Sequence, residues 1–180
     1  IFKNNSSFNW GGGAYIEESE TIFINCLFLS NYAERWGGGI FIDQSNPTLT
    51  NCTFEENVAD VSAGGMLLQY SNPLITQCTF INNIADGNGG GMFCYSSSPE
   101  IMHCTLASNA AGGEGGGVRC FNNSSPTLTH CSFSNNTAYR SGGAMANIPD
   151  GTPLISDSHF CNSYPTHIYG AWADGGGNTM

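Results

Sequence analysis

The chain of 180 residues is long enough for one domain with a sizeable core, and 40% apolar residues exclude a disordered composition. Fourteen acidic residues against four Lys and Arg give a net charge of −10, which argues against nucleic acid, whose phosphates need a basic surface. No apolar run approaches the ~20 residues of a membrane helix. The sequence begins at Ile1, with neither an initiator Met nor a signal-peptide pattern. We therefore expect the natural chain to begin upstream.

Taken along the chain, the sequence repeats itself with a period of 26 residues. "NCTFEENVADVSAGGM" at 51–66 is followed at 77 by "QCTFINNIADGNGGGM". A cysteine column contains Cys26, Cys52, Cys78, Cys104 and Cys131. An aromatic column contains Phe2, Phe28, Phe54, Phe80 and Phe133, with Leu106 in the remaining place. An asparagine column contains Asn5, Asn31, Asn57, Asn83, Asn109 and Asn136. Such self-similarity indicates a repeat architecture.

The elements within one copy are short β-type runs. "GIFID" (39–43) and "PTLTNCTF" (47–54) are the clearest, and their alternation places Ile40 and Ile42 inward and Phe41 outward. Glycine triplets and a proline in every copy exclude helical repeats, and the sparse Leu excludes leucine-rich repeats. The pattern predicts an all-β solenoid of about 26 residues per coil and six to seven coils, with parallel strands ~4.8 Å apart. Its coils would span 1–159, starting in mid-repeat, and 160–180 would be an irregular closing segment.

Stacking explains why the copies agree, because each residue's main neighbour is then its own equivalent one coil away. We expect Asn57 to exchange amide hydrogen bonds with Asn31 and Asn83, and Phe54 to stack between its equivalents. Glycine would supply the corner with positive φ. The predicted inward set in one copy is Cys52, Phe54, Asn57, Ala59, Met66 and Leu68.

The motifs "FEEN", "FINN" and "FSNN", followed by "GGG" or "GGA", resemble the FxxN and GGA repeats of chlamydial polymorphic outer membrane proteins. Similar repeats occur in large secreted bacterial β-helix proteins, and the resemblance covers about residues 1–160. It implies a right-handed parallel β-helix, export to the surface, and adhesive or structural roles.

Two polar columns are candidates for chemistry. The cysteine column favours buried thiols over disulfides between coils, and the absence of CxxC spacing argues against zinc. Glu34, Asp60 and Asp86 align on three successive coils, so that either a bridging Ca²⁺ or a solvated acidic edge would relieve their repulsion. We expect no cofactor.

An outward apolar stripe is the candidate binding surface. Its members are Trp10 and Trp36 at the corner, and Tyr15, Phe41, Leu67 and Phe93 on the following strand. Core packing does not explain such a stripe. It is either covered by a loop or another chain, or it is a sugar-stacking or protein-binding face.

The regular coils favour a scaffold over an enzyme. Lys3, Arg35, Arg119 and Arg140 are scattered over different coils, so no lyase base stands beside a cation site. Glu17 and Asp43 face outward on adjacent coils and could meet the carboxylate spacing of a glycosidase, but nearly any acidic ladder would do so. We predict a non-catalytic, exported, adhesin-like or fibrous segment of a larger bacterial surface protein, which binds a glycan or a cell-surface protein. The alternative is a carbohydrate-active or carbohydrate-binding β-helix.

The two ends are expected to differ. Tyr164, Ile168, Tyr169 and Trp172 are large enough to fold over the last coil's open core. At the other end only Ile1 precedes Phe2, so we expect polypeptide of the same or a neighbouring chain to cover this end, with end-to-end self-association of the isolated chain.

Overall fold

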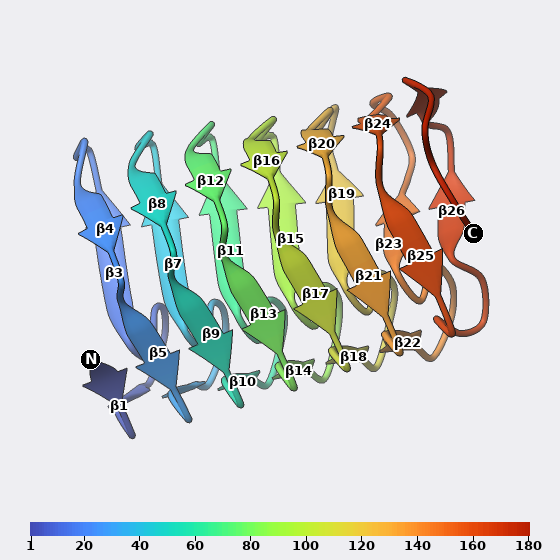
Figure 1. Cartoon of the computed structure of the whole chain (residues 1–180). Coiled ribbons are helices and arrows are strands. Elements are labelled where there is room, and N and C mark those ends of the chain that lie inside the picture. The colour runs from blue at the N-terminus through green and yellow to red at the C-terminus, as the bar shows by residue number, and fades with distance from the viewer.

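The protein is a parallel β-solenoid. The computed structural model describes all of residues 1–180 and contains strands but no helix. Four sheets run along the stack, with the coils following one another from the N-terminus to the C-terminus (Figure 1). Six coils have four strands each, and a seventh has three, which agrees with the predicted number.

Each sheet takes one strand from every coil. The first sheet contains β1 (Phe2–Lys3), β5 (Leu27–Leu29), β9 (Thr53–Glu55), β13 (Thr79–Ile81), β17 (Thr105–Ala107), β21 (Ser132–Ser134) and β25 (His159–Cys161). The second contains β2 (Ser6–Ser7), β6 (Tyr32–Ala33), β10 (Val58–Ala59), β14 (Ile84–Ala85), β18 (Ala110–Ala111) and β22 (Thr137–Ala138). The third contains β3 (Ala14–Glu17), β7 (Ile40–Asp43), β11 (Met66–Gln69), β15 (Met92–Tyr95), β19 (Val118–Phe121), β23 (Met145–Asn147) and β26 (Ile168–Gly170). The fourth contains β4 (Ile22–Ile24), β8 (Thr48–Thr50), β12 (Leu74–Thr76), β16 (Glu100–Met102), β20 (Thr127–Thr129), β24 (Leu154–Ser156) and β27 (Ala173–Asp174).

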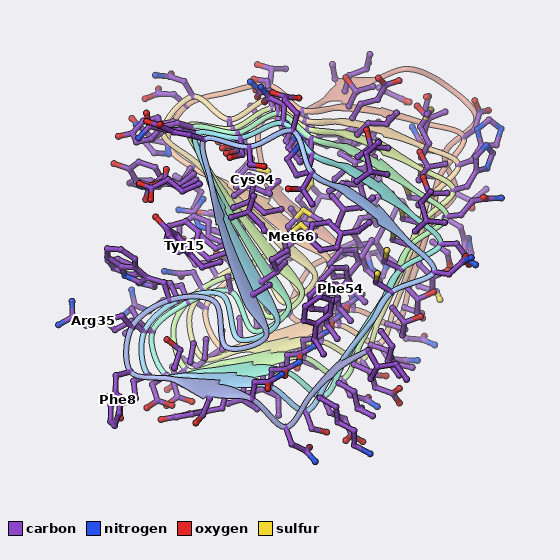
Figure 2. The ribbon with its side chains drawn as sticks, turned by 90° about the vertical axis from the view of Figure 1, so that its left-hand side faces the viewer. Phe8, Tyr15, Arg35, Phe54, Met66 and Cys94 are labelled. Carbon is purple, nitrogen blue, oxygen red and sulfur yellow. The ribbon has the colours of Figure 1, made fainter.

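The core lies inside the coil and follows the predicted columns. Phe28 pairs in register with Phe54, whose ring stacks on those of Phe28 and Phe80 at centroid distances of 4.6 and 4.7 Å. All six members of the predicted inward set are buried. Figure 2 shows Phe54 and Met66 inside the coil and Tyr15 projecting from its outer face. The predicted register and direction of alternation are therefore confirmed.

The asparagine column is a continuous buried ladder. The backbone N–H and the side-chain amide of Asn57 both donate to Oδ1 of Asn83, at 3.1 and 2.9 Å. Asn31 donates to Asn57 in the same way, at 3.0 and 2.9 Å. The Asn57 amide also donates to the carbonyl of Phe28 at 2.9 Å, so the corner's buried polar groups are satisfied by equivalents in adjacent coils.

Two further corners work in the same manner with other side chains. The N–H of Ser71 donates to Oγ of Ser97 at 3.0 Å, and the N–H of Cys52 donates to Sγ of Cys78 at 3.4 Å. At each corner the preceding residue has positive φ, for example 49° at Tyr70. The sequence predicted positive φ only for the glycine at the small-residue corner. At the corners of the asparagine, serine and cysteine columns, a non-glycine residue has positive φ instead. One residue in the left-handed region is enough to turn the chain there.

The glycine corner itself is confirmed, with one exception. The first glycine of the triplet has positive φ, as at Gly37 (69°) and Gly89 (68°). Ala63 takes the same place in the third coil with φ of 63°. The middle glycine, Gly38, has no room for a side chain, because a Cβ there would lie 2.3 Å from the Val58 carbonyl oxygen.

The segment 160–180 continues the coil instead of being irregular throughout. β26 pairs with β23, and β27 pairs with β24, both in parallel. Ile168 and Trp172 pack against the core cluster, as expected of residues that cover the last coil, whereas Tyr164 and Tyr169 are exposed. At the other end Phe2 is partly buried against Phe28.

Candidate functional site: an aromatic pocket on the third sheet

The outer face of the third sheet carries two rows of side chains. One row, in register, is Tyr15, Phe41, Leu67, Phe93 and Arg119. The other is Glu17, Asp43, Gln69, Tyr95 and Phe121. The loops between the second and third sheets protrude beside this face, and Arg35 marks the edge of one of them (Figure 2).

These loops cover the middle of the first row. Phe41 and Leu67 are only 2% and 4% exposed, and with Ala63 they form a small cluster separate from the main core. Trp36 and Phe93 pack against that cluster. Of the two explanations that the sequence left open, cover by a neighbouring loop therefore accounts for Phe41 and Leu67.

At the N-terminal end of the face the aromatic side chains pack on one another. The rings of Trp10 and Trp36 are stacked at 6.4 Å, and Trp10 meets Phe41 edge-on at 5.8 Å. Tyr15 lies 5.3 Å from Phe41. The rings in this group contact one another and leave no pocket between them. Trp10, Tyr15 and Phe41 therefore do not line the pocket described next.

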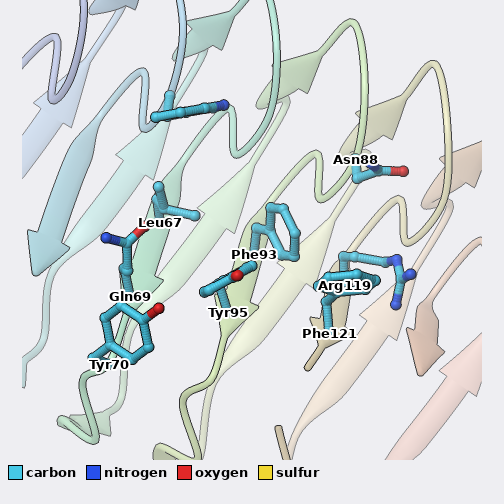
Figure 3. Close-up of a pocket in the computed structure, with 9 residues that line it drawn as sticks. Leu67, Gln69, Tyr70, Asn88, Phe93, Tyr95, Arg119 and Phe121 are labelled. Carbon is cyan, nitrogen blue, oxygen red and sulfur yellow. The ribbon is translucent and has the colours of Figure 1, made fainter. Parts of the chain in front are cut away.

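A pocket of about 420 Å³ opens over the third to fifth coils. Its nine lining residues are Trp36, Leu67, Gln69, Tyr70, Asn88, Phe93, Tyr95, Arg119 and Phe121. In Figure 3, Tyr70, Tyr95 and Phe121 lie in a row across neighbouring coils, beside a second row of Leu67, Phe93 and Arg119. The pocket is thus walled by rings and floored by the sheet.

The rings present their faces at different angles. Tyr70 and Tyr95 are perpendicular at a centroid distance of 5.8 Å, and Tyr95 and Phe121 are tilted by 32° at the same distance. Tyr70 is 53% exposed and Phe121 is 36% exposed. Large aromatic surfaces left open to solvent in a concave site are characteristic of ligand binding.

Arg119 closes the C-terminal end of the pocket. Its guanidinium forms an ion pair with Glu114 at 3.0 Å, donates to the carbonyls of Cys120 and Ile148, and stands 5.3 Å from the ring centre of Phe121. Burial lowers the pKa of Arg119, and Glu114 opposes that shift. The positive charge of Arg119 is therefore already balanced by Glu114 within the protein.

The carboxylate pair lies on the same face but outside the pocket. Glu17 and Asp43 are adjacent in register, and Gln69 Nε2 donates to Asp43 Oδ1 at 3.3 Å. Burial raises the pKa of Asp43, and the neighbouring charge of Glu17 adds to the effect. Burial and the two carboxylates together raise the pKa of Tyr15 to about 12.

The other predicted columns take no part in this pocket. Glu34, Asp60 and Asp86 are exposed, Asp60 accepts a hydrogen bond of 2.5 Å from the Tyr32 hydroxyl, and the structure contains no group of three or more His, Cys, Asp or Glu side chains suited to a metal. All eight cysteines are free thiols. Hydrogen bonding to Cys104 raises the pKa of Cys78 to about 12, so the thiol stays neutral and unreactive.

Half of the predicted binding surface reaches the pocket. Trp36, Leu67 and Phe93 line it. Sequence reasoning missed Tyr70, Tyr95 and Phe121, because these belong to no aromatic column. For Tyr95 and Phe121 the signal was a change within one row, which reads Glu17 and Asp43 at one end and aromatic residues at the other. Tyr70 follows Gln69 and lies outside that row, so it gave no such signal.

The comparisons with known proteins agree with this architecture. Residues 1–179 match the family model described as a right-handed beta helix region. No curated protein and no solved structure matches the chain. No helix in the structure is long and apolar enough to cross a membrane. Since the family model covers nearly the whole chain, the protein belongs to the right-handed β-helix family.

Proposed function

We propose that the chain is a non-catalytic, exported, adhesin-like segment of a larger bacterial surface protein, in which the solenoid is a rigid scaffold for the aromatic pocket. The observation that carries this proposal is the group of three rings, Tyr70, Tyr95 and Phe121, which leaves aromatic surface open to solvent on the outer face. The core does not need these rings, because the inward columns already fill the coil.

A surface location is supported by the sequence motifs. The FxxN and GGA motifs resemble those of chlamydial polymorphic outer membrane proteins, which are exported. The acidic, charge-poor composition, with polarity supplied by Asn, Ser, Thr and Gly, fits a protein that meets a surface through shape and stacking and not through opposite charge.

The titratable groups in the pocket support recognition over catalysis. Hydrolysis of a glycosidic bond ordinarily uses two carboxyl groups that flank one bond. The pocket lining contains no carboxylate, and its one cationic group, Arg119, is paired with Glu114.

A carbohydrate-active β-helix is the second candidate, and one observation favours it. Asp43 has a raised pKa, which suits a general acid, and exposed Glu17 stands beside it in register. Such a reaction would take place at the N-terminal end of the third sheet, next to the pocket.

One experiment separates the two candidates. The chain is incubated with intact bacterial and animal cells and with a panel of insoluble polysaccharides, and both its retention and the release of reducing ends are measured. We expect retention without release. Release of sugar products that Asp43→Asn abolishes would overturn the proposal in favour of an enzyme, and absence of retention on every surface would also contradict it.

A further inference from the structure

The pocket combines ring faces with hydrogen-bonding groups that the protein leaves unused. The hydroxyls of Tyr70 and Tyr95 and the amide nitrogen of Asn88 make no hydrogen bond within the chain, whereas Asn88 Oδ1 accepts from the N–H of Glu114 at 2.9 Å. Gln69 donates to Asp43, which fixes its amide and leaves its carbonyl oxygen free. A ligand in the pocket would therefore contact both the flat apolar faces of the aromatic rings and these unused hydroxyl and amide groups.

From these features we infer that the pocket binds a neutral glycan, one or two sugar rings at a time; the inference rests on the proposed function and names its ligand class. A sugar ring has an apolar face of C–H groups and a rim of hydroxyls. It therefore stacks on Tyr and Phe rings while its hydroxyls bond with phenol and amide groups. The volume of about 420 Å³ accommodates such a ligand.

The charges around the pocket select an uncharged ligand. An anionic sugar meets a chain of net charge −10, with Glu17 and Asp43 on the same face, and finds Arg119 already paired with Glu114. A cationic ligand that sought the aromatic rings would meet the guanidinium that already stands over Phe121 at 5.3 Å.

The angles between the rings also favour a glycan over a flat aromatic group. Tyr70 and Tyr95 stand at 89°, so that they contact two sides of a thick, non-planar ring. Because Tyr95 and Phe121 occupy the same row on adjacent coils, successive sugars would lie along the solenoid axis, with Tyr70 at one end.

The test is calorimetric titration of the full chain with three groups of probes. The first is neutral oligosaccharides of glucose, mannose, xylose, galactose and N-acetylglucosamine, and the second is oligogalacturonate. The third is tetramethylammonium together with a proline-rich peptide. We expect at least one neutral oligosaccharide to bind, with an affinity that stays constant when NaCl is raised about tenfold, since no charge is neutralised.

Variants locate the site. Tyr70→Ala and Tyr95→Ala should each weaken the binding by about tenfold or more, because each removes a stacking wall. Tyr139→Ala is the matched control, since Tyr139 is 85% exposed and lies outside the pocket, and it should bind as the unaltered chain does. Thermal unfolding of all three variants checks that they remain folded.

The outcomes distinguish this inference from the proposed function. Retention on cells that neither tyrosine variant weakens would leave the adhesin-like function standing and overturn the glycan pocket. Binding of oligogalacturonate, tetramethylammonium or the peptide in preference to every neutral sugar would overturn the ligand class. Hydrolysis of a bound oligosaccharide would overturn the non-catalytic function while the pocket assignment stands.

Discussion

The inside and the outside of the same coils obey different rules. Inside, Phe28, Phe54 and Phe80 repeat with their rings at nearly constant spacing. On the outer face of the third sheet, the row that begins at Glu17 changes its residue type along the stack. Only its last two members, Tyr95 and Phe121, are aromatic. An inward residue must match its equivalent in the next coil, whereas an outward residue needs only to suit a strand. Function is therefore to be sought where the repeat fails.

The sharpest way to test the inner rule is to break the asparagine ladder. Asn57→Leu removes the acceptor for two donors of Asn31 and leaves the Phe28 carbonyl without its amide partner. Because several buried polar groups lose partners at once, we expect a loss of about 3–5 kcal/mol in unfolding free energy, measured in urea.

Asn9→Leu is the control for that change, since the Asn9 side chain is exposed. It should alter stability by no more than about 0.5 kcal/mol. An unchanged midpoint for Asn57→Leu would mean that the ladder does not hold the corner.

A smaller effect should follow from changes in the cysteine column. Cys78 Sγ accepts the N–H of Cys52 at 3.4 Å, and Ser158 fills the equivalent role for Cys131 at 3.1 Å. Cys78→Val removes the acceptor and should cost about 1–3 kcal/mol, whereas Cys78→Ser keeps it and should cost about 1 kcal/mol or less. Thermal unfolding under reducing conditions measures both. If Ser proved more costly than Val, packing and not hydrogen bonding would explain the column.

The smallest effect is expected on the outer face. The pKa of Asp43 is raised in the folded chain, so its contribution to stability is fully present below its ordinary pKa and is lost as pH rises through the folded value. At pH 7 Asp43→Asn should therefore raise the thermal midpoint slightly, and the gain should vanish at a pH of about 3.

Glu17→Gln separates burial from charge in that experiment, since it removes one negative charge from an exposed position on the same face. It should give a smaller gain than Asp43→Asn at pH 7. A gain for Asp43→Asn that persists unchanged at low pH would contradict the assigned cause.

The sequence predicted the columns well because their residues depend on identical neighbours. The register of Phe54, the ladder through Asn57 and the glycine corner at Gly37 all follow from a 26-residue period. Pocket residues such as Tyr70 and Arg119 were missed, because they differ from their equivalents and only the fold brings them together. For Phe41 the sequence offered loop cover only as one of several alternatives, since the cover depends on the course of the loops beside the third sheet.

The most direct test of this division compares two phenylalanines, one on each side of the coil. Phe133 is fully buried in the inner column and Phe121 stands in the pocket. We predict that Phe133→Ala lowers the thermal midpoint by about 10 °C and leaves oligosaccharide affinity intact in the folded protein, because it removes a core ring. Phe121→Ala should lower the midpoint by only about 2 °C and weaken the affinity by about tenfold. Equal losses of stability in the two variants, or equal binding by both, would contradict the account.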